Sequence, residues 1–85
     1  MANYRILIKP TAVKELNKIP KKDLSRITAK IESLSENPRP PGCEKLAVQY
    51  AYRIRHGSYR IIYTIEDDKL IIFVINIGHR RDVYR

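Results

Sequence analysis

Hydrophobic and polar residues alternate through most of the second half of the chain, and this period of two predicts β-strands. We expect three of them, at roughly 47–56, 59–65 and 69–77. The first two meet at Gly57-Ser58, a pair typical of a tight hairpin turn, and Glu66 to Lys69 supply polar residues for a second turn. Residues 70–77 are nearly all apolar, so we expect this last strand to lie centrally with both faces covered.

The first half of the chain shows the pattern of one strand followed by two amphipathic helices. Residues 3–9 alternate loosely and predict the strand. Thr11 is placed to cap a short helix, and Pro20 ends that helix and can stand at the first position of the next. The expected buried stripes are Ala12, Val13, Leu16 and Ile19 in the first helix, and Leu24, Ile27, Ile31 and Leu34 in the second. A proline-rich connector at 36–42 then leads to the strands.

These elements predict an α+β fold in the order strand, two-helix hairpin and three antiparallel strands (β-α-α-β-β-β). The 85 residues are enough for one small domain with a single modest core, which we place over the whole chain, 1–85. A hydrophobic content of 44% is ordinary for a folded protein. The helical hairpin would cover one face of the sheet, and the opposite face would stay open.

Three arginines are predicted to share that open face. Arg53 and Arg55 are two residues apart in one strand, so both side chains leave the sheet on the same side. Arg60 pairs with Arg55 if Gly57-Ser58 forms the turn, or with Arg53 if the turn falls one residue earlier, and it joins the same face in either register. Like charges facing one another cost about 0.2–1 kcal/mol per pair, so the cluster indicates an anion as its binding partner.

Composition narrows the kind of partner. The 17 Lys and Arg against 9 Asp and Glu give a net charge of +8, which favours nucleic acid or an acidic protein. The chain has no apolar run of membrane-spanning length and no N-terminal signal pattern, so we expect no membrane association and a cytoplasmic location. A single cysteine, Cys43, excludes an internal disulfide, and with only two histidines we expect neither a metal site nor a cofactor.

The hairpin and the C-terminal tail together carry the groups that RNA cleavage requires. Attack of a 2′-hydroxyl on the adjacent phosphate needs cations around the phosphorane, a base and an acid. An aromatic ring that stacks on a splayed base completes the set. The candidates are Arg53, Arg55, Arg60 and Arg80 for charge, His79 for proton transfer, and Tyr84 as the aromatic residue. This chemistry does not require a metal ion.

Three motifs resemble the RelE/ParE superfamily of toxins from toxin–antitoxin modules. They are Tyr52-Arg53-Ile54-Arg55, Gly57-Ser58-Tyr59-Arg60-Ile61-Ile62-Tyr63 and Gly78-His79-Arg80-Arg81-Asp82-Val83-Tyr84, and the resemblance extends over nearly the whole chain. It implies an α+β fold with an antiparallel sheet and a cytoplasmic toxin. It also implies a small, acidic, RelB-like antitoxin that folds around the toxin. Within the superfamily, the RelE branch cleaves messenger RNA in the ribosomal A site, whereas the ParE branch poisons DNA gyrase.

The resemblance also implies roles for single residues. RelE-type enzymes have basic residues at the positions of Arg53 and Arg55, arginines at those of Arg60 and Arg80, and a tyrosine at that of Tyr84. The best-known members have lysines at the first two positions, and one of these is thought to help remove the 2′-proton. Arginine does not readily give up its proton, so this chain needs another base.

His79 is the sequence candidate for that base or for the acid, because histidine titrates near neutral pH. A surface histidine that follows a strand is the alternative interpretation. Tyr84 is assigned to stacking on a base, with proton transfer as its second possible role. Arg81 is a candidate contact for RNA or for the antitoxin, and a solvated charge is the preferred interpretation of it.

Three functions follow from these residues. The leading prediction is a metal-independent, RelE-type endoribonuclease that works on ribosome-bound messenger RNA and leaves a 2′,3′-cyclic phosphate and a free 5′-hydroxyl. The second is a ParE-like inhibitor of DNA gyrase. The third is a module that binds RNA or the ribosome without cutting, since phosphate binding and phosphorane stabilisation use the same side chains.

Overall fold

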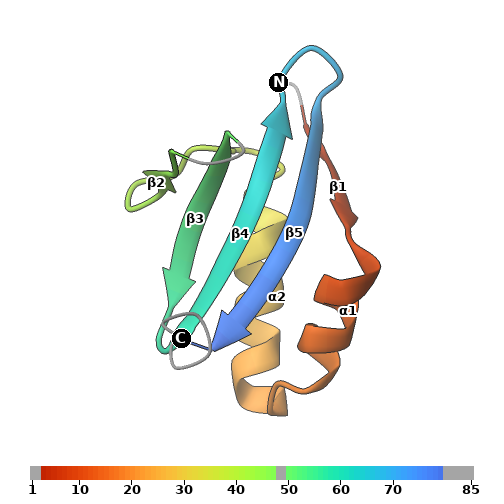
Figure 1. Ribbon diagram of the computed structural model, residues 1–85, viewed down its shortest axis with the longest axis vertical. Coiled ribbons are helices and arrows are strands. Elements are labelled where there is room, and N and C mark those ends of the chain that lie inside the picture. The colour runs from red at the N-terminus through yellow and green to blue at the C-terminus, as the bar shows by residue number, and fades with distance from the viewer. Residues whose placement is uncertain (1–2, 48–49, 80–85) are drawn as a thin grey trace.

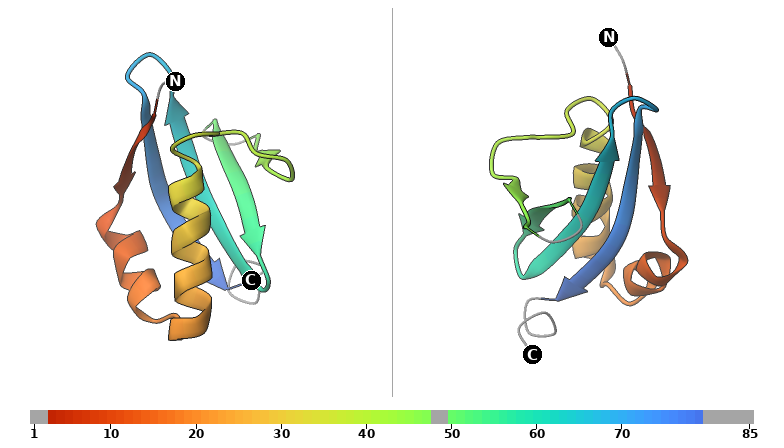
Figure 2. Two further views of the ribbon diagram at one scale, coloured as in Figure 1. Left: turned by 180° about the vertical axis from the view of Figure 1, so that it is seen from behind. Right: turned by 45° about the horizontal axis from the view of Figure 1, so that its top comes forward.

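The structure is a mixed five-stranded sheet with two helices packed on one of its faces (Figures 1 and 2). This computed structural model describes residues 3–47 and 50–79. The elements are β1 (Arg5–Ile8), α1 (Pro10–Asn17), α2 (Lys21–Ser33), β2 (Glu44–Lys45), β3 (Ala51–His56), β4 (Tyr59–Glu66) and β5 (Ile71–His79). The predicted α+β class and element order are confirmed, with the two-residue strand β2 as an addition.

A proline stands at the start of both helices, within the first one and just before the second. Pro10 is the first helical residue of α1 and Lys9 is its N-cap, so the prediction that Thr11 caps the helix is wrong. A proline suits this position because its φ is already helical and its missing N–H would have no partner there. Pro20 is the N-cap of α2, one position before the place predicted for it. Val13, predicted to be buried, is 41% exposed.

The strand order in the sheet is β1-β5-β4-β3-β2. The β3–β4 and β4–β5 pairs are antiparallel hairpins, as predicted. β1 instead pairs in parallel with β5, with Leu7 opposite Phe73, so the sheet is mixed where the resemblance implied an antiparallel one. Parallel neighbours need a long connection between them, and here everything from α1 to β4 separates the two strands.

Strand β5 lies inside the sheet, but the prediction that both its faces are covered is wrong. Phe73 is 39% exposed on the face away from the helices. β5 also contains a bulge, because Ile62 pairs with Asn76 while its neighbour Tyr63 pairs with Val74. Ile75 is therefore an extra residue that resets the alternation. As a result, Val74 and the residues beyond the bulge can face the same core without a strict period of two.

The hydrophobic core lies between the helices and the inner face of the sheet. The view from behind shows the two helices covering this face (Figure 2). The core's large, almost fully buried members are Ile27 and Ile31 from α2, Leu34 at the end of α2, Ile54 from β3, Ile61 and Tyr63 from β4, and Ile72, Val74 and Ile77 from β5. Their burial determines which way each strand faces. Every polar residue that alternates with them must point to the open side of the sheet.

A network of hydrogen bonds lies at the end of the sheet away from the β3–β4 turn. We call it the clasp, and it joins Tyr4, Arg39 and Asp67. Arg39, in the proline-rich connector, donates to the Asp67 carboxylate through Nη2 (2.9 Å) and Nη1 (3.3 Å), and the Tyr4 hydroxyl donates to the same carboxylate (2.7 Å). These hydrogen bonds, from Arg39 first and Tyr4 second, hold the pKa of Asp67 below its usual range. The buried Tyr63 hydroxyl donates to the Pro38 carbonyl (2.7 Å). The clasp thereby fixes the connector on the sheet.

Candidate functional site

The β3–β4 hairpin brings three arginines onto the open face of the sheet. Its turn is Gly57-Ser58, and Gly57 takes the left-handed φ of +57° that this tight turn needs. Arg55 lies directly opposite Arg60, while the preceding pair, Ile54 and Ile61, is buried against the helices. The predicted grouping of Arg53, Arg55 and Arg60 on one face is therefore confirmed, in the register predicted for a Gly57-Ser58 turn.

Arg60 is the inner member of the group. It lies on the middle strand, between Arg55 on one side and Gly78 on the other. Only 4% of Arg60 is exposed, although it lies on the side of the sheet that the helices leave open. Its register partner on β5, Gly78, has no side chain.

Arg53 has an acidic neighbour that the sequence did not reveal. Glu44 of β2 is its register partner, and a carboxylate oxygen of Glu44 lies 2.5 Å from Nη2 of Arg53. The Arg53 side chain is 16% exposed and that of Glu44 is 55% exposed. Within the described residues, Nε of Arg53 is buried and has no hydrogen-bond partner. A two-residue strand has no periodicity to detect, so Glu44 could not be placed beside Arg53 from the sequence.

A lysine from α2 joins the hairpin from the other side of the sheet. Nζ of Lys30 donates to the backbone carbonyl of Arg55 (2.8 Å). β2 pairs with β3 only at Tyr52 and Arg53, so this carbonyl lies beyond the part of the edge that β2 covers. Lys30 supplies the hydrogen bond that the short neighbouring strand does not. It also fixes the end of β3 that carries Arg55 and adds a positive charge nearby.

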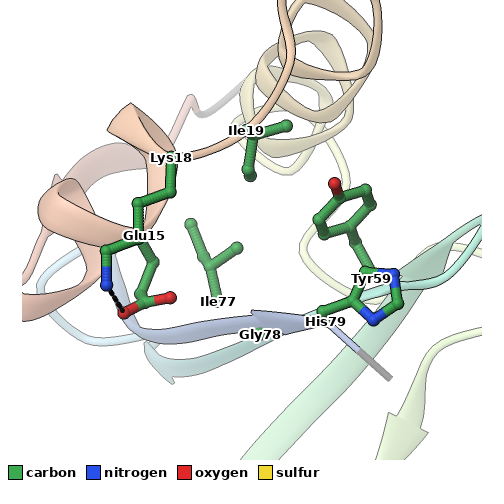
Figure 3. Close-up of a pocket in the computed structure, with 7 residues that line it drawn as sticks. All are labelled: Glu15, Lys18, Ile19, Tyr59, Ile77, Gly78 and His79. Atoms are coloured by element: carbon green, nitrogen blue, oxygen red, sulfur yellow. Dashed lines mark hydrogen bonds and ion pairs between the residues drawn. The ribbon is translucent and has the colours of Figure 1, made fainter. Parts of the chain in front are cut away.

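His79 lies on the opposite face from the arginines. β5 continues to His79, which pairs with Tyr59, and alternation places both on the helix side of the sheet. Their rings meet edge to face with centroids 5.2 Å apart. They line a pocket of about 200 Å³ beside the end of α1 (Figure 3), whose residues are Glu15, Lys18, Ile19, Tyr59, Ile77, Gly78 and His79. The structure therefore does not bring His79 to the three arginines.

The remaining sequence candidates lie outside the described residues. These are Arg80, Arg81 and Tyr84, whose roles stay predictions. In the described part of the chain, no group of three or more His, Cys, Asp or Glu side chains could hold a metal ion. None of the helices in that part is long and apolar enough to cross a membrane.

The arrangement is suited to holding a phosphate and stabilising added negative charge on it. Arg55 and Arg60 lie on adjacent strands, where directly opposite Cα atoms are about 4.5–5.5 Å apart. Arg53 is two residues along β3, about 6.6 Å from Arg55 at the usual strand rise. Donors held in place by a sheet need little reorganisation when charge develops, which is the condition for stabilising a transition state electrostatically.

Comparison with known proteins gives a consistent result. The chain matches the family described as "ParE toxin of type II toxin-antitoxin system, parDE" over residues 6–84. It is 29% identical over 85 residues to a putative RelE-like toxin protein of Escherichia coli, covering 95% of this chain and 90% of that protein. It is 30% identical over 71 residues to the mRNA interferase toxin RelE of Escherichia coli K12, covering 81% and 75%.

Among solved structures, the fold is similar to that of the archaeal RelE–RelB complex from Pyrococcus horikoshii OT3. The TM-score is 0.84 at 28% identity, over 92% of this chain and 96% of that one. The sequence and the fold of this chain thus match the same group of toxins. This protein belongs to the ParE/RelE family and is a RelE-like toxin of a type II toxin–antitoxin system.

Proposed function

We propose that this toxin is a RelE-type endoribonuclease that cuts messenger RNA positioned by the ribosome. The observation that carries the proposal is the cross-strand pair of Arg55 and Arg60 on the open face of the sheet. Two cations held side by side at an energetic cost to the fold suit a site whose ligand is a phosphate. The relative named mRNA interferase toxin RelE supports the same activity.

In the proposed reaction, the 2′-oxygen of a nucleotide attacks the adjacent phosphorus and the bond to the 5′-oxygen of the next nucleotide breaks. The 2′-hydroxyl gives its proton to a base, and the leaving 5′-oxygen takes a proton from an acid. The products are a 2′,3′-cyclic phosphate and a free 5′-hydroxyl. Arg55 and Arg60 hold the non-bridging oxygens as the phosphorane gains charge, with Arg80 as a further cation by resemblance. No step in this scheme calls for a metal ion.

Proton transfer is the part of the scheme for which the described residues supply the least support. His79 lies on the helix side of the sheet, where it contacts Tyr59 instead of facing the arginines. Tyr84 is the other candidate for this step, and it lies outside the described residues. Stacking on a splayed base remains its first proposed role.

A neutralising antitoxin is part of the proposal. Complexes of RelE with RelB are among the similar structures, and the net charge of +8 favours an acidic partner. Apolar side chains of the described surface offer further contacts for such a partner. They include Val13 on α1, Leu7 on β1 and Phe73 on β5, and the last two are adjacent register partners on the open face. We expect the antitoxin to be an acidic, partly disordered chain that folds on binding.

Inhibition of DNA gyrase is the second candidate, because the matching family is described by the name ParE. Primer extension on a translated message distinguishes the RNase from the gyrase inhibitor. Wild-type protein and Arg60→Ala are added to intact ribosomes and to naked RNA, and a parallel assay follows supercoiling by gyrase. Cuts that require ribosomes and disappear with the substitution support the RNase. Intact message together with blocked supercoiling would favour the gyrase inhibitor.

A further inference from the structure

One of the three arginines on the open face is already engaged by an anion from the protein itself. Glu44 faces Arg53 in the β2–β3 register and forms an ion pair with its Nη2. Within the described residues, Glu44 is the acidic side chain paired with this arginine group. In this state Arg53 offers less net charge to a phosphate than its position on the face implies.

The Glu44–Arg53 pair is incomplete. A carboxylate can take two parallel hydrogen bonds from a guanidinium, but here a single contact joins Oε2 to Nη2. Nε of Arg53 is buried and has no partner in the described part of the chain. A buried donor without an acceptor is unfavourable, because it has lost its hydrogen bond to water and gained none. A phosphate, with more oxygens to offer, could satisfy the donors of Arg53 more fully.

Glu44 is also easy to displace. It belongs to a strand of two residues at the edge of the sheet, and more than half of its side chain is exposed. Its carboxylate can return to water with little desolvation to reverse, and exposed ion pairs contribute little to stability. The ion pair therefore joins an exposed carboxylate, which is easily displaced, to a largely buried guanidinium.

We propose that Glu44 acts as an internal substitute for an RNA phosphate on Arg53 and is displaced when RNA binds. This inference rests on the proposed function, in which RNA is the ligand. RNA that reached Arg53 alone would only exchange one anion for another and gain little. RNA that also reaches Arg55, which is exposed and forms no ion pair within the described residues, gains a further contact. Glu44 thus makes tight binding depend on simultaneous contact with Arg53 and Arg55.

Fluorescence anisotropy with a short single-stranded RNA, 2′-O-methylated throughout so that it cannot be cut, measures this competition. Glu44→Gln is expected to tighten binding roughly two- to tenfold, because the substitution removes an exposed competing ion pair. The dependence of log K on log salt should steepen by up to about 0.7, the value for one more phosphate contact on a single strand. Glu32→Gln, at an exposed position on α2, is the control with the same change in net charge.

The proposal also requires that Glu44 acts through Arg53. In the Arg53→Gln background, Glu44→Gln should give no further gain in affinity. An equal gain with Glu32→Gln, or a gain that persists without Arg53, would mean a general charge effect and overturn the proposal. Unchanged binding together with a large loss of cleavage in Glu44→Gln would also overturn it and assign Glu44 to the chemistry.

The same variants separate this inference from the proposed function. If wild-type protein cuts translated message and Glu44→Gln leaves RNA affinity unchanged, the RNase proposal stands and the role of Glu44 is wrong. If no message is cut but the affinity gain appears and depends on Arg53, the face is a phosphate-binding surface without this chemistry.

Discussion

Arg55 and Arg60 face each other across the β3–β4 hairpin, on the side of the sheet that the helices leave open. The buried pair Ile54 and Ile61, one step away, fixes this orientation, because strand residues alternate between the two faces. A change that moved the register by one residue would send the arginines into the core. The site is therefore maintained by the same burial that stabilises the domain.

Arg60→Ala should slow cleavage of translated message by roughly 10²–10³-fold, the usual cost of removing a preorganised transition-state donor. Arg60 is buried, so its loss could also affect folding, and thermal unfolding should be followed alongside activity. Arg5→Ala is the control, because Arg5 is exposed on β1 and belongs to the same outer face. Equal losses in both variants would indicate a general charge effect instead of a specific role for Arg60.

His79→Ala should leave the cleavage rate within a few fold of wild type. The side chain lies on the helix side of the sheet beside Tyr59, whereas the arginines lie on the other side. General acid–base catalysis contributes about 10²–10⁴-fold, so single-turnover cleavage rates separate the two possibilities clearly. A loss in that range would return His79 to the reaction. His79→Gln would then test whether proton transfer or ring packing is responsible.

The sequence predicted the arginine face because two simple rules act there together. Alternation places Arg53 and Arg55 on one side, and a two-residue turn at Gly57-Ser58 brings Arg60 to the same side. His79 was not assigned to a strand, because the last strand was expected to end at Ile77. The strand in fact continues two residues further, and the alternation then directs His79 away from the arginines.

Other parts of the site could not be predicted because they depend on tertiary contacts. Glu44 belongs to a strand of two residues, too short to show any period. The sequence pattern predicts that Lys30 is an ordinary solvated charge on α2. Its Nζ in fact donates a hydrogen bond to the carbonyl of Arg55, 25 residues away in the sequence. The bulge at Ile75 was not apparent from the sequence either, because an inserted residue changes the phase of alternation within an apolar run.

Gly57→Ala should destabilise the domain by about 1–2 kcal/mol, the cost of placing an L-residue in the left-handed region. Gly57 has a φ of +57°, and an added Cβ would meet no atom within 4 Å, so backbone conformation alone sets the penalty. Gly57→Asn should cost less, because asparagine tolerates this conformation better. Urea denaturation measures both values. Equal losses for alanine and asparagine would contradict the backbone explanation.

The free energy of unfolding should depend on pH because the clasp lowers the pKa of Asp67. Hydrogen bonds from Arg39 and Tyr4 hold the pKa of Asp67 below its usual range in the folded state. A lowered folded-state pKa means that the unfolded chain binds a proton more readily than the folded one. The stabilisation is therefore fully present above the ordinary aspartate pKa of about 3.9, and it is lost as pH falls through the lower folded-state value.

Asp67→Asn should remove this dependence. Urea denaturation of wild type between pH 2 and pH 7 should show stability falling on the acid side, and the variant should show a shallower fall over the same range. Asp68→Asn is the matched control, since Asp68 is the next residue in the turn and forms no ion pair within the described part of the chain. If both variants flatten the curve equally, net charge is responsible and the clasp is not. If only Asp67→Asn does so, the contacts from Arg39 and Tyr4 are the cause, and the connector that leads to Glu44 is held to the sheet by a carboxylate that must stay ionised.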